Sequence, residues 1–166
     1  IYKNGMEPDK REVEIRLQSF HSVYHKAISE QIQRIRSKYG FALLFDCHSI
    51  KSKLPFLFEG ELPDLNLGTN EGSTCDMEIE KVLVELFSNI SRYKFVLNGH
   101  FKGGWTTRHY GDPENGIHAI QLELAQKIYM EEFYPWNYNY IRAKILRVHL
   151  KEILSCLESH LTQNLK

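Results

Sequence analysis

Polar residues that could do chemistry follow a short apolar run near the middle of the chain, in the stretch FALLFDCHS that begins at Phe41. The apolar part, residues 41–45, is typical of a strand buried on both faces. Open α/β sheets bind their ligands at the carboxyl ends of their strands, so Asp46 and His48 are candidates for a functional site. The alternative is that His48 begins an ordinary solvent-exposed loop, and this stretch alone does not decide between the two.

Two further predicted strands also end on polar side chains. The segment KFVLN ends at Asn98, and IHAIQLEL carries Glu123 next to its end. If the strands are parallel neighbours, these residues would meet Asp46 and His48 in one crevice. A neutral imidazole that ligates a zinc-like ion, a glutamate that takes a proton from metal-bound water and an arginine that holds a carboxylate would together be the parts of a metal-assisted hydrolase.

Each candidate also has a structural interpretation. Glu123 could lie at the start of a helix, because LAQKIYMEE looks helical and acidic residues favour that end. Arg108 could pair with a surface acid, and His109 could simply be exposed or structural. A nucleophilic pair of Cys47 and His48 is disfavoured, because adjacent residues of a strand point to opposite faces.

Hydrophobic periodicity predicts the elements that position these residues. A long helix is expected from an N-cap at Asp9 to a stop at Gly40, a second over residues 76–91, and a third over the C-terminal part of the chain. Residues 50–75 are expected to form a long irregular segment, which in a compact domain is usually functional. The order of elements predicts an α/β fold, a mostly parallel sheet flanked by helices. Four histidines of the helices are interpreted as surface or boundary residues: His21, His25, His149 and His160.

Composition narrows the classes of partner. The 21 basic and 21 acidic residues balance and form no basic block, which argues against nucleic acid or an anionic membrane as partner. No apolar run reaches the ~20 residues of a membrane span. Three widely spaced cysteines form neither a disulfide framework nor a zinc knuckle, so a cytoplasmic location is expected. The length predicts a single domain over residues 1–166, and a start at Ile1 with few strands predicts a partial domain truncated at its N-terminus.

Three longer motifs resemble the N-formylglutamate amidohydrolase family. They are FDCHSIKSKLPFLFEGELPDLNLGTNEGSTCD, VLNGHFKGGWTTRHYGDP and GIHAIQLELAQKIYMEE, and they occur in this order up to Glu132. The resemblance implies a zinc-carboxypeptidase-like fold that here lacks its N-terminal strands. It also implies metal-dependent hydrolysis of N-formyl-L-glutamate to formate and L-glutamate, in the last step of one route of histidine degradation.

The resemblance also implies roles for particular residues. His48 would be a ligand of a divalent metal ion, expected to be zinc, and Glu123 would be the catalytic base. Arg108 would bind a substrate carboxylate or the developing oxyanion. The other residues expected to bind substrate are Asn66, Asn98, Lys102 and His109.

Two departures from the family pattern leave other functions open. His100 stands where the family has the arginine of Asn-Gly-Arg-Phe-Lys-Gly-Gly, and this exchange is not neutral at a site that grips a carboxylate with two hydrogen bonds. One alternative is therefore a deacylase or carboxypeptidase-like hydrolase of another N-acyl amino acid. The family's upstream motifs with the other metal ligands are absent, so a second alternative is a non-catalytic fragment that binds carboxylates. A truncated sheet would expose an apolar edge, which predicts self-association.

Overall fold

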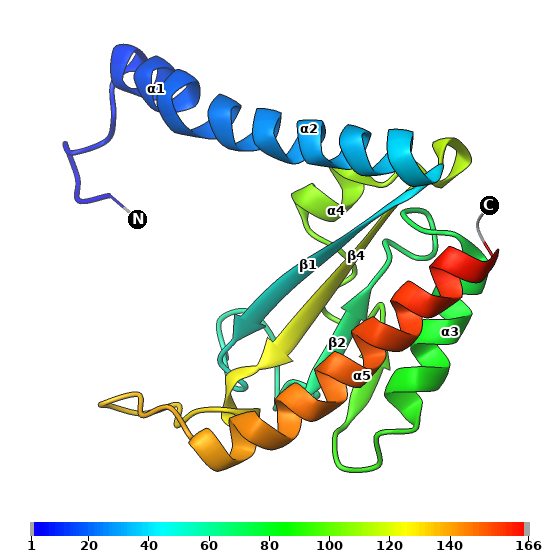
Figure 1. The fold of residues 1–166 in the computed structure, drawn as a ribbon. Coiled ribbons are helices and arrows are strands. Elements are labelled where there is room, and N and C mark those ends of the chain that lie inside the picture. Colours follow the sequence, from blue (N-terminus) through cyan, green and yellow to red (C-terminus); the bar gives the residue numbers. More distant parts are fainter. Residues whose placement is uncertain (1, 165–166) are drawn as a thin grey trace.

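The structure, a computed structural model, describes residues 2–164 and contains a four-stranded sheet with helices on both faces (Figure 1). The strand order is β1-β4-β2-β3. β1 pairs with β4 in parallel and β2 pairs with β3 in parallel, whereas β2 and β4 are antiparallel. The α/β class and the mostly parallel sheet are therefore confirmed. The strands are β1 (Ala42–Ile50), β2 (Leu65–Gly68), β3 (Phe95–Leu97) and β4 (Ile117–Ala125).

The antiparallel contact between β2 and β4 corrects the expectation that three strands deliver their polar ends to one edge. β1 and β4 do run in the same direction, but β3 runs in the opposite direction to β4. The carboxyl end of β3, which Asn98 follows, therefore does not lie at the same edge of the sheet as the carboxyl ends of β1 and β4. β2 itself lies inside the segment 50–75 that was expected to be irregular. It is buried at all four of its positions, and four residues are too few to give a periodic pattern.

The first predicted helix is confirmed at both of its ends. The Asp9 side chain accepts a hydrogen bond of 2.7 Å from a backbone N–H of the first turn, and Gly40 ends the helix in the left-handed conformation with φ 86°. Its interior departs from a regular α-helix. α1 (Lys10–Arg16) continues into a π-helical turn, η1 (Leu17–His21), and then into α2 (Ser22–Tyr39). None of the side chains in α1 and η1 is buried, and this end of the helix extends away from the sheet in Figure 1.

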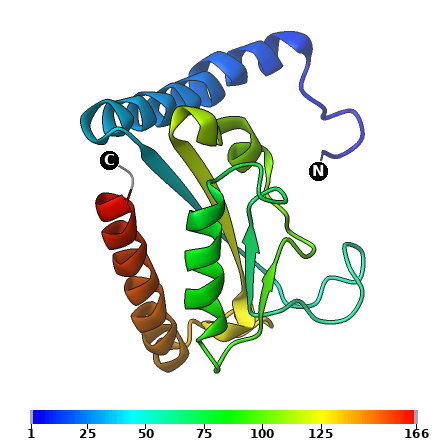
Figure 2. The ribbon, with the colours of Figure 1, turned by 90° about the vertical axis from the view of Figure 1, so that its right-hand side faces the viewer.

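α3 (Met77–Ser88) and α5 (Tyr140–Asn164) cover one face of the sheet, as Figures 1 and 2 both show. The helix predicted over residues 76–91 is α3, which has Asp76 as its N-cap and ends at Ser88; the Asp76 carboxylate accepts a hydrogen bond from Glu78 N. Leucine, isoleucine and phenylalanine side chains of these two helices and of the facing strands form the main core. Residues at most 2 % exposed in this core include Leu67, Leu83, Phe87, Ile120, Leu122 and Leu157.

α2 and a short helix, α4 (Trp105–Tyr110), pack on the other face of the sheet. They cover the first residues of β1 and β4, where a small core forms between Ile32, Ala42, Tyr110 and Ile117. The remainder of this face, toward the carboxyl ends of β1 and β4, carries polar side chains. Within residues 2–164, no helix is both long enough and apolar enough to cross a bilayer.

Gly68, the last residue of β2, packs directly against the backbone of the loop that leads to α4. A Cβ atom there would lie 2.6 Å from the carbonyl carbon of Lys102 and 2.7 Å from Gly103 N. We expect Gly68→Ala to lower the free energy of unfolding by about 1–3 kcal/mol, the usual range for overpacking, because backbone cannot move aside as a flexible side chain can. Urea unfolding measures the change.

The matched control for Gly68→Ala is Gly99→Ala in the same region. There the new Cβ would meet only the Val96 side chain, at 3.1 Å. Since that side chain can adjust, we expect the control to lose less than half as much stability. Equal losses for the two variants would show that the close backbone approach at Gly68 is not the cause.

Candidate active site

The register of the sheet brings three of the predicted site residues together. His48 of β1 and Asn66 of β2 are both directly paired with Glu123 of β4. Residues paired across strands point to the same face of a sheet, so the three side chains lie side by side on the face that carries α2 and α4. The prediction that His48 and Glu123 lie together required β1 and β4 to be parallel neighbours, and they are.

Glu123 is a buried carboxylic acid, with 6 % of its surface exposed. Burial raises the pKa of its carboxyl above the ordinary value; the nearby His48 opposes this change and Asp46 adds to it. The Nε2 atom of Gln121 lies 3.4 Å from Glu123 Oε2. A carboxyl whose proton affinity is raised in this way suits a general base at neutral pH. The interpretation of Glu123 as the first residue of a helix is wrong, because it lies within β4.

His48 and Asp46 form a close pair on the same face, as their two-residue spacing along β1 requires. His48 Nε2 lies 2.9 Å from Asp46 Oδ2. That oxygen is buried and has no hydrogen bond of good geometry to any described residue. The His48 side chain is 47 % exposed and Asp46 is 21 % exposed. The imidazole is therefore open to solvent on one side and has a carboxylate behind it.

Cys47 and Ser49 point to the opposite face of β1, as expected for neighbours of His48. Ser49 Oγ lies 2.7 Å from the hydroxyl of Tyr129. Burial, with a contribution from Asp46, raises the pKa of the Cys47 thiol, which disfavours the reactive thiolate. Neither residue is placed to act as a nucleophile with His48.

Gln121 links the start of α4 to Glu123, and sequence reasoning did not select it. Gly104 N, at the start of α4, donates a hydrogen bond of 2.5 Å to Gln121 Oε1, and Arg108 Nη1 donates to the carbonyl of Gly103. Arg108 is exposed, so other N–H groups of its guanidinium can reach a ligand. The two-residue spacing of Gln121 and Glu123 on one strand is the signal that could have identified Gln121.

Asn66 lies at the level of Glu123, but its amide is partly committed to the backbone. Its Nδ2 donates to the carbonyl of Pro63 at 2.8 Å and to the carbonyl of Glu123 at 3.1 Å. Its Oδ1 is buried without a hydrogen-bond partner among the described residues. Oδ1 is therefore the one acceptor of Asn66 without a partner among residues 2–164, in a side chain that is 0 % exposed.

The structure does not bring Asn98 to this cluster. Its Oδ1 accepts a hydrogen bond from Thr69 N and its Nδ2 donates to Thr69 Oγ1, both at 2.9 Å. The Asn98 side chain therefore ties the end of β3 to the end of β2.

Two other predicted substrate-binding residues are also engaged elsewhere. Lys102 forms an exposed ion pair of 2.5 Å with Glu71. The ring of His109 is stacked on Trp105, with 4.1 Å between centroids. Their binding roles remain predictions.

The segment between β1 and β2 folds over the carboxyl end of β4. Phe58 and Leu62 are buried there against Ala125, which lies two residues after Glu123 and on the same face. The ring of His100, the residue that departs from the family pattern, stacks on Phe58 with 5.2 Å between centroids. His100 is therefore part of the cover of this face.

The Glu132 carboxylate holds the start of this covering segment, the segment between β1 and β2, in place. It accepts hydrogen bonds from Ser52 N at 2.6 Å, from Ser52 Oγ at 2.5 Å and from Lys127 N at 3.0 Å. Ser52 is 2 % exposed. Glu132 connects the segment after β4 to the segment after β1, and nothing in the local sequence pattern indicates this long-range role.

We expect Glu132→Gln to loosen the cover, because an amide has one acceptor oxygen in place of two and would leave a buried donor unpaired at a cost of about 1–3 kcal/mol. Limited trypsin digestion should then cut faster at Lys51 and Lys53. Glu131→Gln is the control, since Glu131 forms a partly exposed ion pair with Arg142, and such pairs contribute little. Unchanged cutting in Glu132→Gln would contradict the fastening role.

The described residues do not complete a metal site on this face. Within residues 2–164, no group of three or more His, Cys, Asp or Glu side chains is arranged to hold a metal ion. A catalytic zinc ion generally has three protein ligands, and this face offers one imidazole, His48, with Asp46 beside it. The residues present therefore do not by themselves fit the zinc ion that the family resemblance implies.

A buried carboxyl beside an imidazole, at the end of the strands where open α/β sheets bind their ligands, defines a site suited to general-base chemistry. The family model for N-formylglutamate amidohydrolase matches residues 1–130. The chain therefore belongs to the N-formylglutamate amidohydrolase family, as the three motifs predicted.

Similar proteins agree with this assignment. The chain is 45 % identical over 157 residues to N-formylglutamate deformylases of Pseudomonas aeruginosa and Pseudomonas putida; the match covers 95 % of this chain and 59 % of each relative. The chain thus spans less than two thirds of the length of these relatives. The crystal structure of N-formylglutamate amidohydrolase from Ralstonia eutropha is similar in fold, with a TM-score of 0.78 and 23 % identity over 90 % of this chain and 54 % of that one.

Proposed function

We propose that this chain carries the catalytic face of an amidohydrolase that converts N-formyl-L-glutamate to formate and L-glutamate. The observation that carries the proposal is the buried Glu123 carboxyl paired across the sheet with His48. The names of the two Pseudomonas relatives support the choice of substrate. Metal dependence, a zinc-carboxypeptidase-like architecture and a place in histidine degradation belong to the same proposal.

Glu123 is the general base in the proposed reaction. It takes a proton from the attacking water, whose oxygen bonds to the formyl carbon, and gives a proton to the nitrogen as the C–N bond breaks. Formate and the amine of glutamate are then the products. Burial favours this role, because a raised pKa makes the carboxylate a better proton acceptor. Gln121, held by Gly104, supports the orientation of Glu123.

Arg108 is the proposed partner of a substrate carboxylate. Its guanidinium is anchored by one hydrogen bond to Gly103 and is otherwise exposed, which leaves N–H groups for a two-pronged contact. Asn66 could offer its unpaired Oδ1 to the substrate. Lys102 would bind substrate only after it separates from Glu71.

A divalent metal ion, zinc by the family resemblance, is part of the proposal as a cofactor. His48 is the ligand that this face would contribute, with Asp46 beside it. No step assigned above to Glu123 or Arg108 depends on the position of such an ion.

Formate release from N-formyl-L-glutamate, with and without added zinc, tests the proposed function. We expect release by the unaltered chain, loss of release in His48→Ala, and full release in His149→Ala, a control on α5. Release of acetate from N-acetyl-L-glutamate, without release of formate from the formyl compound, would favour the alternative of another N-acyl amino acid, which the family departure at His100 keeps open. Calorimetric binding of glutamate without any hydrolysis would favour a non-catalytic carboxylate-binding fragment.

Self-association through β1 is a further part of the proposal. β1 lies at an edge of the sheet, and apolar cavities of ≈ 420 Å³ and ≈ 300 Å³ are lined by its side chains together with α5 and α2. Such an edge pairs readily with another strand. We expect the mass measured by light scattering to rise with protein concentration. A constant monomer mass up to the highest concentration would contradict the expectation.

A further inference from the structure

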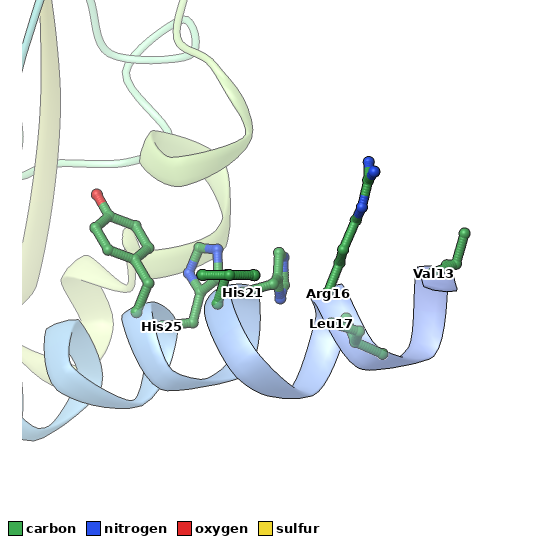
Figure 3. A pocket seen from close by; sticks show the side chains of 7 residues that line it. Val13, Arg16, Leu17, His21 and His25 are labelled. Carbon is green, nitrogen blue, oxygen red and sulfur yellow. The ribbon is translucent and has the colours of Figure 1, made fainter. Parts of the chain in front are cut away.

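A cluster of aromatic and imidazole rings lies between the first long helix and α4, outside the candidate active site. The ring centroids of His21 and His25 are 4.2 Å apart, and those of His25 and Trp105 are 4.8 Å apart. Figure 3 shows the His21 and His25 side chains extending from the same side of the helix. They border an open pocket of ≈ 600 Å³ whose lining comes from residues 13–25.

A short contact with Tyr110 engages one ring nitrogen of His25. His25 Nδ1 lies 2.6 Å from the Tyr110 hydroxyl oxygen, which also lies 3.3 Å from the carbonyl oxygen of His25. Nε2 is therefore the ring nitrogen of His25 that is left to bind a metal ion. Metal-binding histidines are commonly held in this way, with one ring nitrogen hydrogen-bonded and the other free to ligate.

A third imidazole, that of His109, lies near this pair. His109 itself lies 6.4 Å from His25 between ring centroids and is stacked on Trp105, so it does not join the pair as a third ligand.

His21 is positioned by an unusual piece of backbone. It is the last residue of the π-helical turn η1, and single π-helical turns inside α-helices occur often at functional sites. His21 precedes His25 by four residues. This is the spacing at which two histidines on one helix bind the same ion, as in the HExxH motif of zinc proteases.

We propose that His21 and His25 together bind one divalent transition-metal ion of the kind that prefers imidazole, such as Zn²⁺ or Cu²⁺. The site has two protein ligands, and water fills the other positions of the ion. Two ligands agree with the lack of any three-ligand group within residues 2–164. The proposal is independent of the proposed function, because it involves neither Glu123 nor His48.

The fluorescence of Trp105 reports directly on this site. The chain has two tryptophans, so a Trp136→Phe background leaves Trp105 as the single emitter beside His25. We expect titration with CuCl₂ to quench this emission in a saturable manner. We expect His21→Ala to weaken Cu²⁺ binding by at least tenfold, and Tyr110→Phe to weaken it several-fold. Calorimetry with ZnCl₂ on the same variants provides the second measurement.

Two controls separate this site from other metal binding. His149→Ala, on α5, should bind Cu²⁺ as the background protein does. His48→Ala should also leave the quenching of Trp105 unchanged, although it removes the imidazole of the candidate active site. Quenching that survives in His21→Ala, that does not saturate, or that disappears in His48→Ala would overturn the proposal. Because His21 is exposed, its replacement is not expected to unfold the chain, and circular dichroism checks this.

Discussion

Glu123→Gln is expected to lower the turnover of N-formyl-L-glutamate by about 10²–10⁴-fold, the usual range for the loss of a general base, with little change in KM. Glutamine has nearly the same shape as glutamate but cannot accept a proton from water. The neighbouring Gln121 and His48 would keep their places, so substrate binding should persist. Initial rates of formate release, measured over a range of substrate concentrations, separate kcat from KM.

Glu131→Gln is the matched control for this prediction, because Glu131 pairs with Arg142 in the segment after β4. It should retain full turnover. A Glu123→Gln variant with full turnover would remove Glu123 from the mechanism, whereas equal losses of kcat in both variants would indicate a general effect of removing a carboxylate.

The same substitution should not destabilise the chain at neutral pH. The pKa of Glu123 is raised in the folded state, chiefly by burial, so the folded chain holds this proton more tightly than the unfolded chain does. Above the ordinary value of 4.5, ionisation of Glu123 therefore costs stability. We expect Glu123→Gln to match or exceed the melting temperature of the unaltered chain at pH 7, with the difference shrinking at pH 4. A lower melting temperature at pH 7 would contradict the burial argument.

Phe87→Ala is expected to lower the free energy of unfolding by about 3–5 kcal/mol. Phe87 is fully buried in α3 and its ring stacks on Phe95 of β3, with 5.4 Å between centroids. Truncation removes the apolar contacts of the ring and leaves a cavity between the helix and the sheet. A loss of this size is a large part of the 5–15 kcal/mol that stabilises a typical domain. Urea unfolding followed by circular dichroism measures it.

Phe56→Ala is the control for Phe87→Ala, because Phe56 is 85 % exposed. Exposed substitutions of this kind usually change stability by less than about 0.5 kcal/mol. If both variants lose similar stability, the burial of Phe87 between α3 and the sheet is not a main contribution to the free energy of unfolding. If Phe87→Ala loses less than about 1 kcal/mol, the core must relax into the cavity.

Local signals in the sequence determined the starts of the first two helices, the end of the first of them and the identity of the first strand. Asp9 and Asp76 cap helices with their own carboxylates, and Gly40 ends a helix because its left-handed φ is easy for glycine. The change from apolar residues to Asp46 and His48 along β1 was visible in the sequence because it spans consecutive residues. The strand ends also gave Glu123, and the motifs added the family, since both rest on residues read in order along the chain.

The tertiary structure alone decided which strands pair and which polar groups meet. β2 enters the sheet antiparallel to β4, so Asn98 binds Thr69 and does not join Glu123. The hydrogen bonds between Gly104 and Gln121, between Ser52 and Glu132, and between His25 and Tyr110 join residues 17 to 85 positions apart. Periodicity and capping act over a few residues, whereas these contacts depend on how whole elements pack. Their geometry follows from the assembled core, which no local pattern specifies.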